Sequence, residues 1–474
     1  MDAIKTDLLV IGAGSGGLSV AAGAAQMGAR VVLLEGHEMG GDCLNYGCVP
    51  SKALLAAGHA AHAMGAGRPM GVAPADPQVD YAQAQAHVAR VIAAIAPHDS
   101  QERFEGLGVQ VIRAYGRFTG PRSVEAGGTH ITARRIVVAT GARAVVPPIP
   151  GLADVPYLTN ETLFKLPQKP QHLLIMGAGP IGLEMAQAHR RLGCAVSVVD
   201  AGPAFGRDDP ELAAIALAQL RAEGIEIIEN CAVSAVERGA SDAGVCLQLA
   251  DGRRLQGSHL LVAVGRRPNI EQLNLPAAGV RSTAAGIEVD ARLRSSNRRV
   301  YAIGDVAGGM QFTHVAGYHA GLVIREILFG LPARHSTAHL PRVTYTAPEL
   351  AQVGLTEAEA RATHGDALQV VRVDMAQNDR ALATGQGAGL LKLMVVRGRP
   401  VGASIVGAQA GELIGLWSLA IAQRMKMAAL ASMVAPYPTL WEMNKRAVGG
   451  YFSPRLFDNP RVKQVVRLVQ RWLP

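Results

Sequence analysis

Two cysteines are the residues of this chain best suited to chemistry. Cys43 and Cys48 lie five positions apart in the segment Gly-Gly-Asp-Cys-Leu-Asn-Tyr-Gly-Cys-Val-Pro-Ser-Lys, which ends at Lys52. If a helix begins at Cys48, the positive end of its dipole and the nearby lysine favour a thiolate over a thiol. Such a thiolate is a good leaving group and a good electron donor. The segment therefore predicts a redox-active cysteine pair; the alternative is two buried cysteines that serve as small apolar residues.

The composition limits the class of protein to which the chain can belong. Its 474 residues are enough for about three domains. The 54 glycines, with 49% apolar and 4% aromatic residues, fit a globular α/β protein with many tight turns. Five cysteines are too few for a secreted disulfide scaffold. We expect the other three, Cys194, Cys231 and Cys246, to be inert core residues.

A glycine pattern near the N-terminus predicts a dinucleotide site. An apolar strand at 8–11 runs into G-x-G-x-x-G, and a second strand ends at Glu35. In this pattern Gly12 makes the turn and Gly14 lets the backbone approach a pyrophosphate. Gly17 lets the helix pack closely on the strand, and Glu35 can accept hydrogen bonds from the adenosine ribose.

The same pattern returns in the middle of the chain. It follows a strand at 173–176, and its glycines are Gly177, Gly179 and Gly182. Two patterns imply two bound nucleotides. The acid that ends the next strand, Asp200, suits a free ribose 2′-hydroxyl and would repel a 2′-phosphate, so NADH is favoured over NADPH. Arg207 weakens this inference, because it lies close enough in the sequence to bend back toward a phosphate.

Three further buried strands end at residues that we expect to meet the cofactors. One strand ends at Gly141, another at Gly265, and a third at Asp305. The carboxyl ends of strands are where open α/β sheets bind ligands. The first two turns are places where the chain could cross between domains. We expect Gly141 and Asp305 at the first nucleotide and Gly265 at the second.

The C-terminal third has a different texture. Strand patterns at 341–346, 370–373 and 390–396 surround a helix that opens with a capping pattern at Thr356. These patterns predict an α+β domain with an antiparallel sheet.

The last residues, 451–474, form a basic extension with five cations and one acid, Asp458. From Asn459 onward the pattern predicts an amphipathic helix, with a capping asparagine and a first-turn proline. One hypothesis is that its apolar face docks on the protein's own dimer. The other is a peripheral membrane contact through residues 455–474. The basic residues are Arg455, Arg461, Lys463, Arg467 and Arg471.

Neither a signal peptide nor a transmembrane helix is expected. The N-terminus is short and polar, and even the apolar stretch 403–433 contains charged residues. The net charge of +8 comes from dispersed Arg and Lys, and no nucleic-acid module is present. We predict a cytoplasmic protein without a nucleic-acid partner. A peripheral position on the inner face of the membrane is the second hypothesis for its location.

Together these motifs resemble the class I pyridine nucleotide-disulfide oxidoreductases, the flavoprotein disulfide reductases. The resemblance covers roughly residues 4–450 and is strongest to mercuric reductase, followed by dihydrolipoamide dehydrogenase. It implies two Rossmann-like domains, for FAD and NAD(P)H, and a C-terminal α+β dimerisation domain. The implied boundaries are 1–150 with 270–337 for FAD, 151–269 for NAD(P)H, 338–450 for the dimer, and 451–474 for the extension.

The resemblance also implies roles for single residues. Cys48 would form a charge-transfer pair with the flavin, and Cys43 would be the interchange sulfur that meets the substrate. Asp305 would hold the flavin ribityl chain. Lys52 would pair with Glu184 beside the flavin ring, where a cation stabilises negative charge. The active site would be shared across a homodimer.

Two positions depart from the family pattern. Asp42 replaces a small hydroxyl residue, and we expect its charge to raise the pKa of Cys43. The C-terminal motif has Tyr437 where disulfide reductases have a histidine, followed by Glu442. A tyrosine, with an ordinary pKa near 10, cannot act as the base at neutral pH. Mercuric reductases also have tyrosine there, but their metal-capturing domain and C-terminal cysteine pair are absent from this sequence.

The leading hypothesis is an FAD-dependent enzyme that passes electrons from NAD(P)H through Cys43 and Cys48 to an acceptor. The acceptor would be Hg(II), another soft metal or a small oxidant, with the two cysteines as transient ligands and no structural metal. One alternative is dihydrolipoamide dehydrogenase or a related disulfide reductase. An alternative of another class is a flavin-loaded redox sensor or a membrane-peripheral assembly component.

Overall fold

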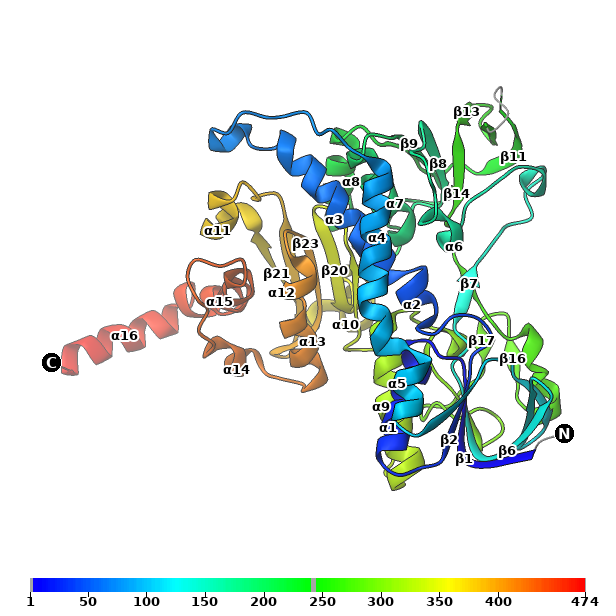
Figure 1. The fold of residues 1–474 in the computed structure, drawn as a ribbon. Helices are drawn as coiled ribbons and strands as arrows, with labels where there is room; N and C mark the ends of the chain where they lie inside the picture. Colours follow the sequence, from blue (N-terminus) through cyan, green and yellow to red (C-terminus); the bar gives the residue numbers. More distant parts are fainter. Residues whose placement is uncertain (1–2, 240–243, 474) are drawn as a thin grey trace. The chain divides into compact units, whose positions relative to one another are not determined.

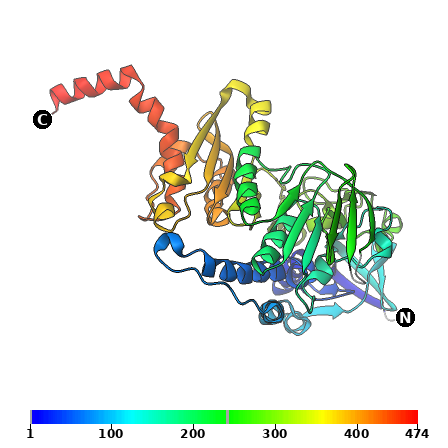
Figure 2. The same ribbon diagram turned by 90° about the horizontal axis from the view of Figure 1, so that it is seen from above.

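The computed structural model describes residues 3–239 and 244–473. The chain divides into two compact units. The first unit contains residues 3–63, 76–201 and 228–336, without 240–243, and the second contains 64–75, 202–227 and 337–473. Figures 1 and 2 show the ribbon in two views. The predicted domain boundaries, which divide the chain differently, stay a prediction.

The largest sheet of the first unit is built around β1. Strands β3, β2, β1, β6 and β18 are parallel, and β5 and β4 continue the sheet as an antiparallel edge. Because strand side chains alternate, Leu8 and Val10 pack against helices α1 and α9, whereas Leu9 and Ile11 face the opposite core. The bounds are β1 (Ala3–Ile11), β2 (Val31–Leu34), β3 (Val109–Ile112), β4 (Arg117–Gly120), β5 (Ser123–Ala126), β6 (Thr129–Val138), β18 (Val300–Ala302), α1 (Ser15–Gln26) and α9 (Thr313–Phe329).

A second parallel sheet in the first unit repeats this strand–helix–strand arrangement. Strand β8 lies between β9 and β14, and helix α7 connects β8 to β9. A three-stranded antiparallel sheet and a two-stranded pair complete the segment. The bounds are β7 (Ala142–Ala144), β8 (His172–Met176), α7 (Pro180–Arg191), β9 (Ala195–Val199), β10 (Glu226–Ile228), β11 (Val233–Arg238), β12 (Val245–Leu249), β13 (Arg254–Gly257), β14 (His259–Val262) and β15 (Arg266–Pro268).

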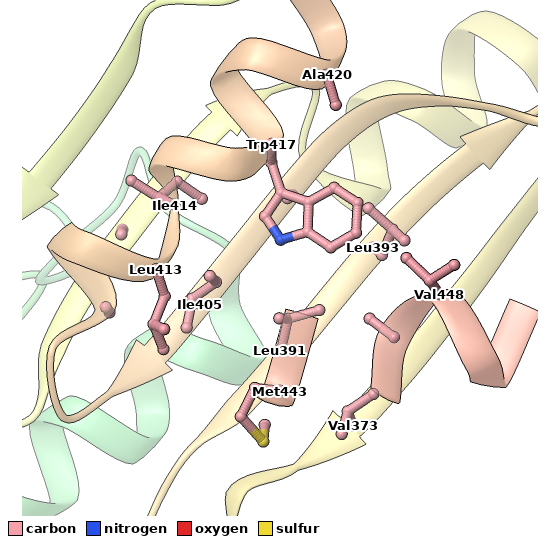
Figure 3. Packing of buried hydrophobic residues seen from close by; sticks show 14 of the residues in the cluster. Val373, Leu391, Leu393, Ile405, Leu413, Ile414, Trp417, Ala420, Met443 and Val448 are labelled. Carbon is pink, nitrogen blue, oxygen red and sulfur yellow. The ribbon is translucent and has the colours of Figure 1, made fainter. Parts of the chain in front are cut away.

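The second unit is organised around an antiparallel sheet in the order β19-β20-β23-β22-β21. Helices α13, α14 and α15 contribute to its apolar core, where the indole of Trp417 is fully buried (Figure 3). Trp417 Nε1 donates a hydrogen bond to Asn444 Oδ1 at 2.8 Å, so the buried indole N–H has an acceptor. The bounds are β19 (Pro341–Thr344), β20 (Glu349–Gly354), β21 (Leu368–Asp374), β22 (Leu390–Val396), β23 (Arg399–Gly407), α13 (Gly415–Ala422), α14 (Met427–Ala431) and α15 (Glu442–Phe457).

Two sequence predictions about helix starts are confirmed in the second unit. Thr356 and Glu359 form a reciprocal capping box at the start of α10, and Asn459 caps α16. Within the described residues, no helix combines the length and the apolar character needed to cross a bilayer. The remaining helices are α2 (Gly41–Asn45), α3 (Cys48–Gly65), α4 (Tyr81–Ile95), α5 (Gln101–Gly106), α6 (Asn160–Leu163), α8 (Pro210–Ala222), α10 (Glu357–His364), α11 (Asp379–Ala383), α12 (Ala410–Leu413) and α16 (Pro460–Trp472).

Candidate active site

The two motif cysteines lie at the junction of two helices in the first unit. Cys43 belongs to the short helix α2, and α3 begins at Cys48, as the sequence predicts. Both are free thiols. Their side chains share a hydrogen bond, and Cys48 Sγ lies 3.2 Å from Oγ1 of Thr313, the first residue of α9. Thr313 was not identified from the sequence, because it is 265 residues away from Cys48.

The two thiols are electrostatically unequal. The pKa of Cys48 is lowered to about 6, chiefly by the hydrogen bond from Cys43 against the effect of burial, and also by Thr313 and the charge of Lys52. The same hydrogen bond, followed by burial, raises the pKa of the Cys43 thiol. At neutral pH the pair therefore keeps one proton, on Cys43, while Cys48 is a thiolate.

Lys52 and Glu184 form the ion pair that the resemblance implies. Lys52 Nζ donates to Glu184 Oε2 at 2.7 Å, which joins helix α3 to helix α7. The carboxylate is buried, whereas the ammonium remains partly exposed. A buried carboxylate needs such a partner, so Glu184 is not the ordinary surface acid that its helix position alone would allow.

Asp42 requires a correction. The sequence predicts that the charge of Asp42 raises the pKa of Cys43. In the structure the pKa of Cys43 is raised instead by the hydrogen bond with Cys48 and by burial. The charge of Asp42 acts instead on Cys48, where it is a minor opposing cause. The negative charge of Asp42 is largely neutralised by Arg266, whose Nη2 lies 3.1 Å from Asp42 Oδ2. Asn160 also donates a hydrogen bond to Asp42 Oδ1 at 2.8 Å.

Arg266 is a site residue that the sequence reasoning missed. Its guanidinium is mostly buried, and it pairs with both Asp42 and Asp305, whose carboxylate lies 3.7 Å from Arg266 Nε. Burial raises the pKa of Asp305, and the charge of Arg266 opposes this shift. A sequence signal for Arg266 existed, because it directly follows Gly265, which comes after a buried strand. Its two carboxylate partners are distant in the sequence, so the ion pairs could not be predicted.

The first glycine pattern has the geometry of a dinucleotide site. Gly12 follows β1 with φ +105°, and a Cβ on Gly17 would overlap the carbonyl oxygen of Gly12. Gly14 caps α1 without a side-chain bond, and the first turn contains no acid, so the helix N-terminus is open to an anion. Glu35 Oε2 accepts from the Ala13 N–H at 2.7 Å, which fixes the acid at the end of β2. These residues fit the adenosine diphosphate part of FAD.

The second pattern repeats this geometry closely. Gly177 follows β8, Gly179 caps α7 without a side-chain bond, and a Cβ on Gly182 would overlap the carbonyl oxygen of Gly177. Asp200 Oδ2 accepts from the Ala178 N–H at 2.7 Å, as Glu35 does in the first pattern. The residues therefore fit a second dinucleotide. The remaining two predicted glycines, Gly141 and Gly265, follow β6 and β14 at positive φ.

The two predicted residues of the C-terminal motif lie in the second unit. Tyr437 is 70% exposed, and its hydroxyl donates to Asp379 Oδ2 at 3.1 Å. This hydrogen bond raises the pKa of Tyr437, which makes the phenol still less suitable as a base. Glu442 is the first residue of α15, and its Oε2 is buried without a hydrogen-bond partner in the described part of the chain.

The other cysteines take the role expected of them as core residues. Cys194, Cys231 and Cys246 are free and buried. Burial raises the pKa of Cys194 to about 11, so this thiol stays protonated at neutral pH.

Comparison with models of known protein families identifies the family of the chain. The family model described as Pyridine nucleotide-disulphide oxidoreductase matches residues 6–320. A second family model, for the dimerisation domain of the same proteins, matches residues 340–448. The chain belongs to the pyridine nucleotide-disulphide oxidoreductase family. This confirms the predicted α/β fold class and the prediction of an oxidoreductase. The family depends on FAD with NAD(P)H, and the dimerisation domain indicates a homodimer.

Several members of the family are similar over most of their length. Mercuric reductase from Acidithiobacillus ferrooxidans is 36% identical, with 94% of this chain and 82% of the relative covered. Mercuric reductase from Streptomyces lividans is 35% identical, and the alignment covers 94% of this chain and 96% of the relative. Dihydrolipoyl dehydrogenase from Geobacillus stearothermophilus is 31% identical, also with 94% and 96% covered.

Solved structures of the family agree with the fold. One is the Cu(II) complex of the HOCl-induced flavoprotein disulfide reductase RclA from Escherichia coli, with a TM-score of 0.84 and 27% identity. Another is LpdA from Mycobacterium tuberculosis, with a TM-score of 0.86 and 25% identity. Each comparison covers 94% of this chain and 99% of the other.

Proposed function

We propose that this family member reduces a soft metal ion, with Hg(II) as the representative acceptor, through Cys43 and Cys48. The observation that carries the proposal is the unequal thiol pair, with a stabilised thiolate on Cys48 and a protonated, partly accessible Cys43. Two adjacent sulfurs are suitable ligands for a soft, thiophilic metal. The similarity to several mercuric reductases supports the same acceptor class.

The two glycine patterns hold the cofactors in this proposal. Open N–H groups at the start of α1 and α7 bind the pyrophosphates, and Glu35 and Asp200 accept from the ribose hydroxyls. Asp305 binds the ribityl chain, and Lys52, oriented by Glu184, offers a cation to the flavin ring. When bound, FAD would supply the two-electron chemistry that connects the reduced nicotinamide to the Cys43–Cys48 disulfide.

The cysteines account for the protons of the reaction. Opening the disulfide takes two electrons and one proton, which remains on Cys43 while Thr313 and Lys52 stabilise the Cys48 thiolate. A bound Hg(II) takes the place of that proton, so both sulfurs ligate it as thiolates. Reduction to Hg(0) consumes a second electron pair, supplied by a second NAD(P)H, and leaves both cysteines reduced. The disulfide is therefore opened only once, and each later turnover oxidises one NAD(P)H for each Hg(II) reduced.

The C-terminal motif argues against an ordinary disulfide substrate. Dihydrolipoamide and glutathione chemistry requires a base that moves a proton between two thiols. In the homodimer we place Tyr437 of the partner subunit opposite Cys43, with Glu442 behind it. A phenol with a raised pKa cannot take up that proton at neutral pH, but it can contact a metal or its thiolates.

We also propose that NADH is the preferred donor. Asp200 ends β9 with one oxygen fixed by the Ala178 N–H, so its negative charge is held where a 2′-phosphate would lie. Expected is a kcat/KM for NADH at least tenfold above that for NADPH, which corresponds to about 1.4 kcal/mol. Asp200→Asn should reduce this ratio, and an unchanged ratio would remove Asp200 as its source.

Steady-state assays with four substrates test the metal proposal. NADH oxidation is measured with Hg(II) in excess thiol, oxidised glutathione and a quinone as acceptors, and NAD⁺ reduction is measured with dihydrolipoamide as the donor. Expected is turnover with Hg(II) that falls at least about 100-fold in Cys43→Ser. Quinone reduction, which does not require the dithiol, should be retained in this variant and serves as the control for intact cofactor sites. Hg(II) turnover that survives in Cys43→Ser would overturn the proposal.

Dihydrolipoamide dehydrogenase remains the second candidate, because the 31% identical relative has that name. Tyr437→His distinguishes the two functions, since it introduces the missing base. Expected is weak dihydrolipoamide turnover in the wild type and an increase of about tenfold or more in the variant. Wild-type turnover with dihydrolipoamide that exceeds turnover with Hg(II) would reverse the order of the two candidates.

A further inference from the structure

Helix α16 is structurally separate from the elements that precede it. Helix α15 ends at Phe457, and α16 begins at Pro460 after Asn459, whose side chain accepts from the Arg461 N–H at 3.0 Å. No residue of α16 is buried, and both views show it extending beyond α15 (Figures 1 and 2). Its 13 residues give a length of about 20 Å, which is too short to span a bilayer.

The two sides of α16 differ sharply in chemistry. At about 100° per residue, seven apolar side chains fall within an arc of about 160°, opposite a polar arc without any acid. Arg461, in the first turn, is a charged residue inside the apolar arc. The polar arc contains Lys463, Gln464, Arg467, Gln470 and Arg471. The exposed members of the apolar arc are Val465, Val466, Leu468, Val469, Trp472 and Leu473, with Val462 partly covered.

Charge complementarity decides which partner suits this surface. Lys463, Arg467 and Arg471 form no ion pair with the described residues. Lys463 and Arg471 each lie about 60° beyond an edge of the apolar arc, and Arg467 lies opposite its centre. A face with three cations opposite a valine-rich stripe, with Trp472 near the end of the stripe, matches the headgroups and acyl boundary of an anionic bilayer. The family's dimerisation domain matches only residues 340–448, so α16 lies outside the part of the chain by which the family forms dimers.

We propose that α16 binds the surface of an anionic lipid bilayer. The helix lies in the plane of the interface, with the valines toward the acyl chains and the basic side chains toward the lipid phosphates. A homodimer presents two such helices, so the second binds at a raised effective concentration. This surface function is independent of the acceptor that the thiol pair reduces.

Vesicle co-sedimentation of the FAD-loaded full chain tests the proposal. One set of vesicles contains equal amounts of phosphatidylglycerol and phosphatidylcholine, and the other contains phosphatidylcholine alone. Expected is binding to the anionic vesicles that weakens with added salt, and little binding to the neutral ones. A chain that ends at Asp458 should lose this binding. Equal sedimentation of the full and shortened chains would overturn the proposal.

Matched variants separate the two faces of the helix. The triple variant Lys463→Gln, Arg467→Gln, Arg471→Gln should bind about 100-fold more weakly, at about fivefold per cation. The variant Lys463→Arg, Arg467→Lys, Arg471→Lys keeps the charge and should bind as the wild type does. On the apolar face, the double variant Val465→Gln, Val469→Gln should abolish binding to the vesicles. The control on the polar face, Gln464→Asn with Gln470→Asn, should bind as the wild type does.

The competing occupant is a second copy of this chain, and the same variants exclude or establish it. Sedimentation velocity without lipid should show the same dimer for the wild type, the shortened chain and the Val465→Gln, Val469→Gln variant. NADH oxidation with quinone should also be unchanged in all three. A dimer that dissociates in these variants, with vesicle binding absent from the wild type, would assign α16 to the dimer and overturn the membrane proposal.

Discussion

Two lysines of this protein contact carboxylates, and their surroundings give the positive charge different roles. Lys392 on β22 is 4% exposed and is held by three carboxylates in the second unit. Lys52 on α3 is 38% exposed and pairs with Glu184 in the first unit. The first charge is surrounded by its counterions, whereas the second also acts on a neighbouring thiol. The same side chain therefore serves structure in one unit and chemistry in the other.

The Lys392 cluster joins strand β22 to the starts of two helices. Asp209, the N-cap of α8, contacts Lys392 Nζ at 2.9 Å, and Glu211 in the first turn contacts it at 2.6 Å. Glu357, at the start of α10, lies at 3.0 Å. Burial alone would lower the pKa of Lys392, but these ion pairs raise it above the ordinary lysine value. The amine is therefore charged at neutral pH, and it carries no proton chemistry there.

Removing Lys392 should have the largest effect on stability. Lys392→Met leaves the buried Asp209 and the nearby glutamates without their central cation, a loss that typically costs about 3–5 kcal/mol. Urea unfolding followed by tryptophan fluorescence measures this loss, because Trp417, Trp441 and Trp472 all lie in the second unit. Turnover of the folded fraction should be close to that of the wild type.

Arg372 provides the matched control for that experiment. It contacts Glu211 and Glu357 as well, but its side chain is 44% exposed, against 4% for Lys392. Arg372→Met should therefore cost about 1 kcal/mol or less. Equal losses in the two variants would show that burial does not distinguish the two cations.

Removing Lys52 should affect turnover more than folding. Loss of a cation aimed at the reacting centre typically reduces kcat by about 10²–10³-fold. Lys52→Met should show this loss in Hg(II)-dependent NADH oxidation. The double variant Lys52→Met, Glu184→Gln should be equally slow, which excludes an unpaired buried carboxylate as the cause. A reduction below tenfold in both variants would place Lys52 with Lys392 as a structural lysine.

Proton titration of Cys48 sharpens the comparison further. The pKa of Cys48 is lowered to about 6, so in the reduced protein the ultraviolet absorbance of a thiolate should appear as the pH rises through about 6. Lys52→Met should move this midpoint upward by about 0.5 to 1 unit, because a cation that favours the thiolate is lost. Lys392→Met should leave the midpoint unchanged, and Cys48→Ser should remove the step. A midpoint that does not respond to Lys52 would contradict the assigned role of its charge.

The sequence predicts one lysine site and misses the other for a physical reason. The glycine patterns, the capping box and the strand alternation are local, and the structure contains each of them where the sequence predicts it. Lys52 and Glu184 are 132 residues apart, and only the family resemblance connects them. Lys392 and Asp209 are 183 residues apart, and no motif marks a lysine within an apolar strand. The Asp42–Arg266 pair was missed in the same way, so the effect of Asp42 was assigned to the wrong thiol.

Thr313, an uncharged neighbour of the same thiolate, lowers the pKa of Cys48 more than the charge of Lys52 does. Its hydroxyl lies 3.2 Å from Cys48 Sγ and lowers the pKa of Cys48, but the bond from Cys43 contributes more. Thr313→Val keeps the shape and removes the donor. A neutral hydrogen bond typically contributes about 0.5–1.5 kcal/mol, so the midpoint should rise by roughly 0.4 to 1 unit. Thr313→Ser should restore it. If the valine and serine variants titrate alike, the hydroxyl is not a donor to the thiolate, and the remaining lowering is due to Cys43 and Lys52.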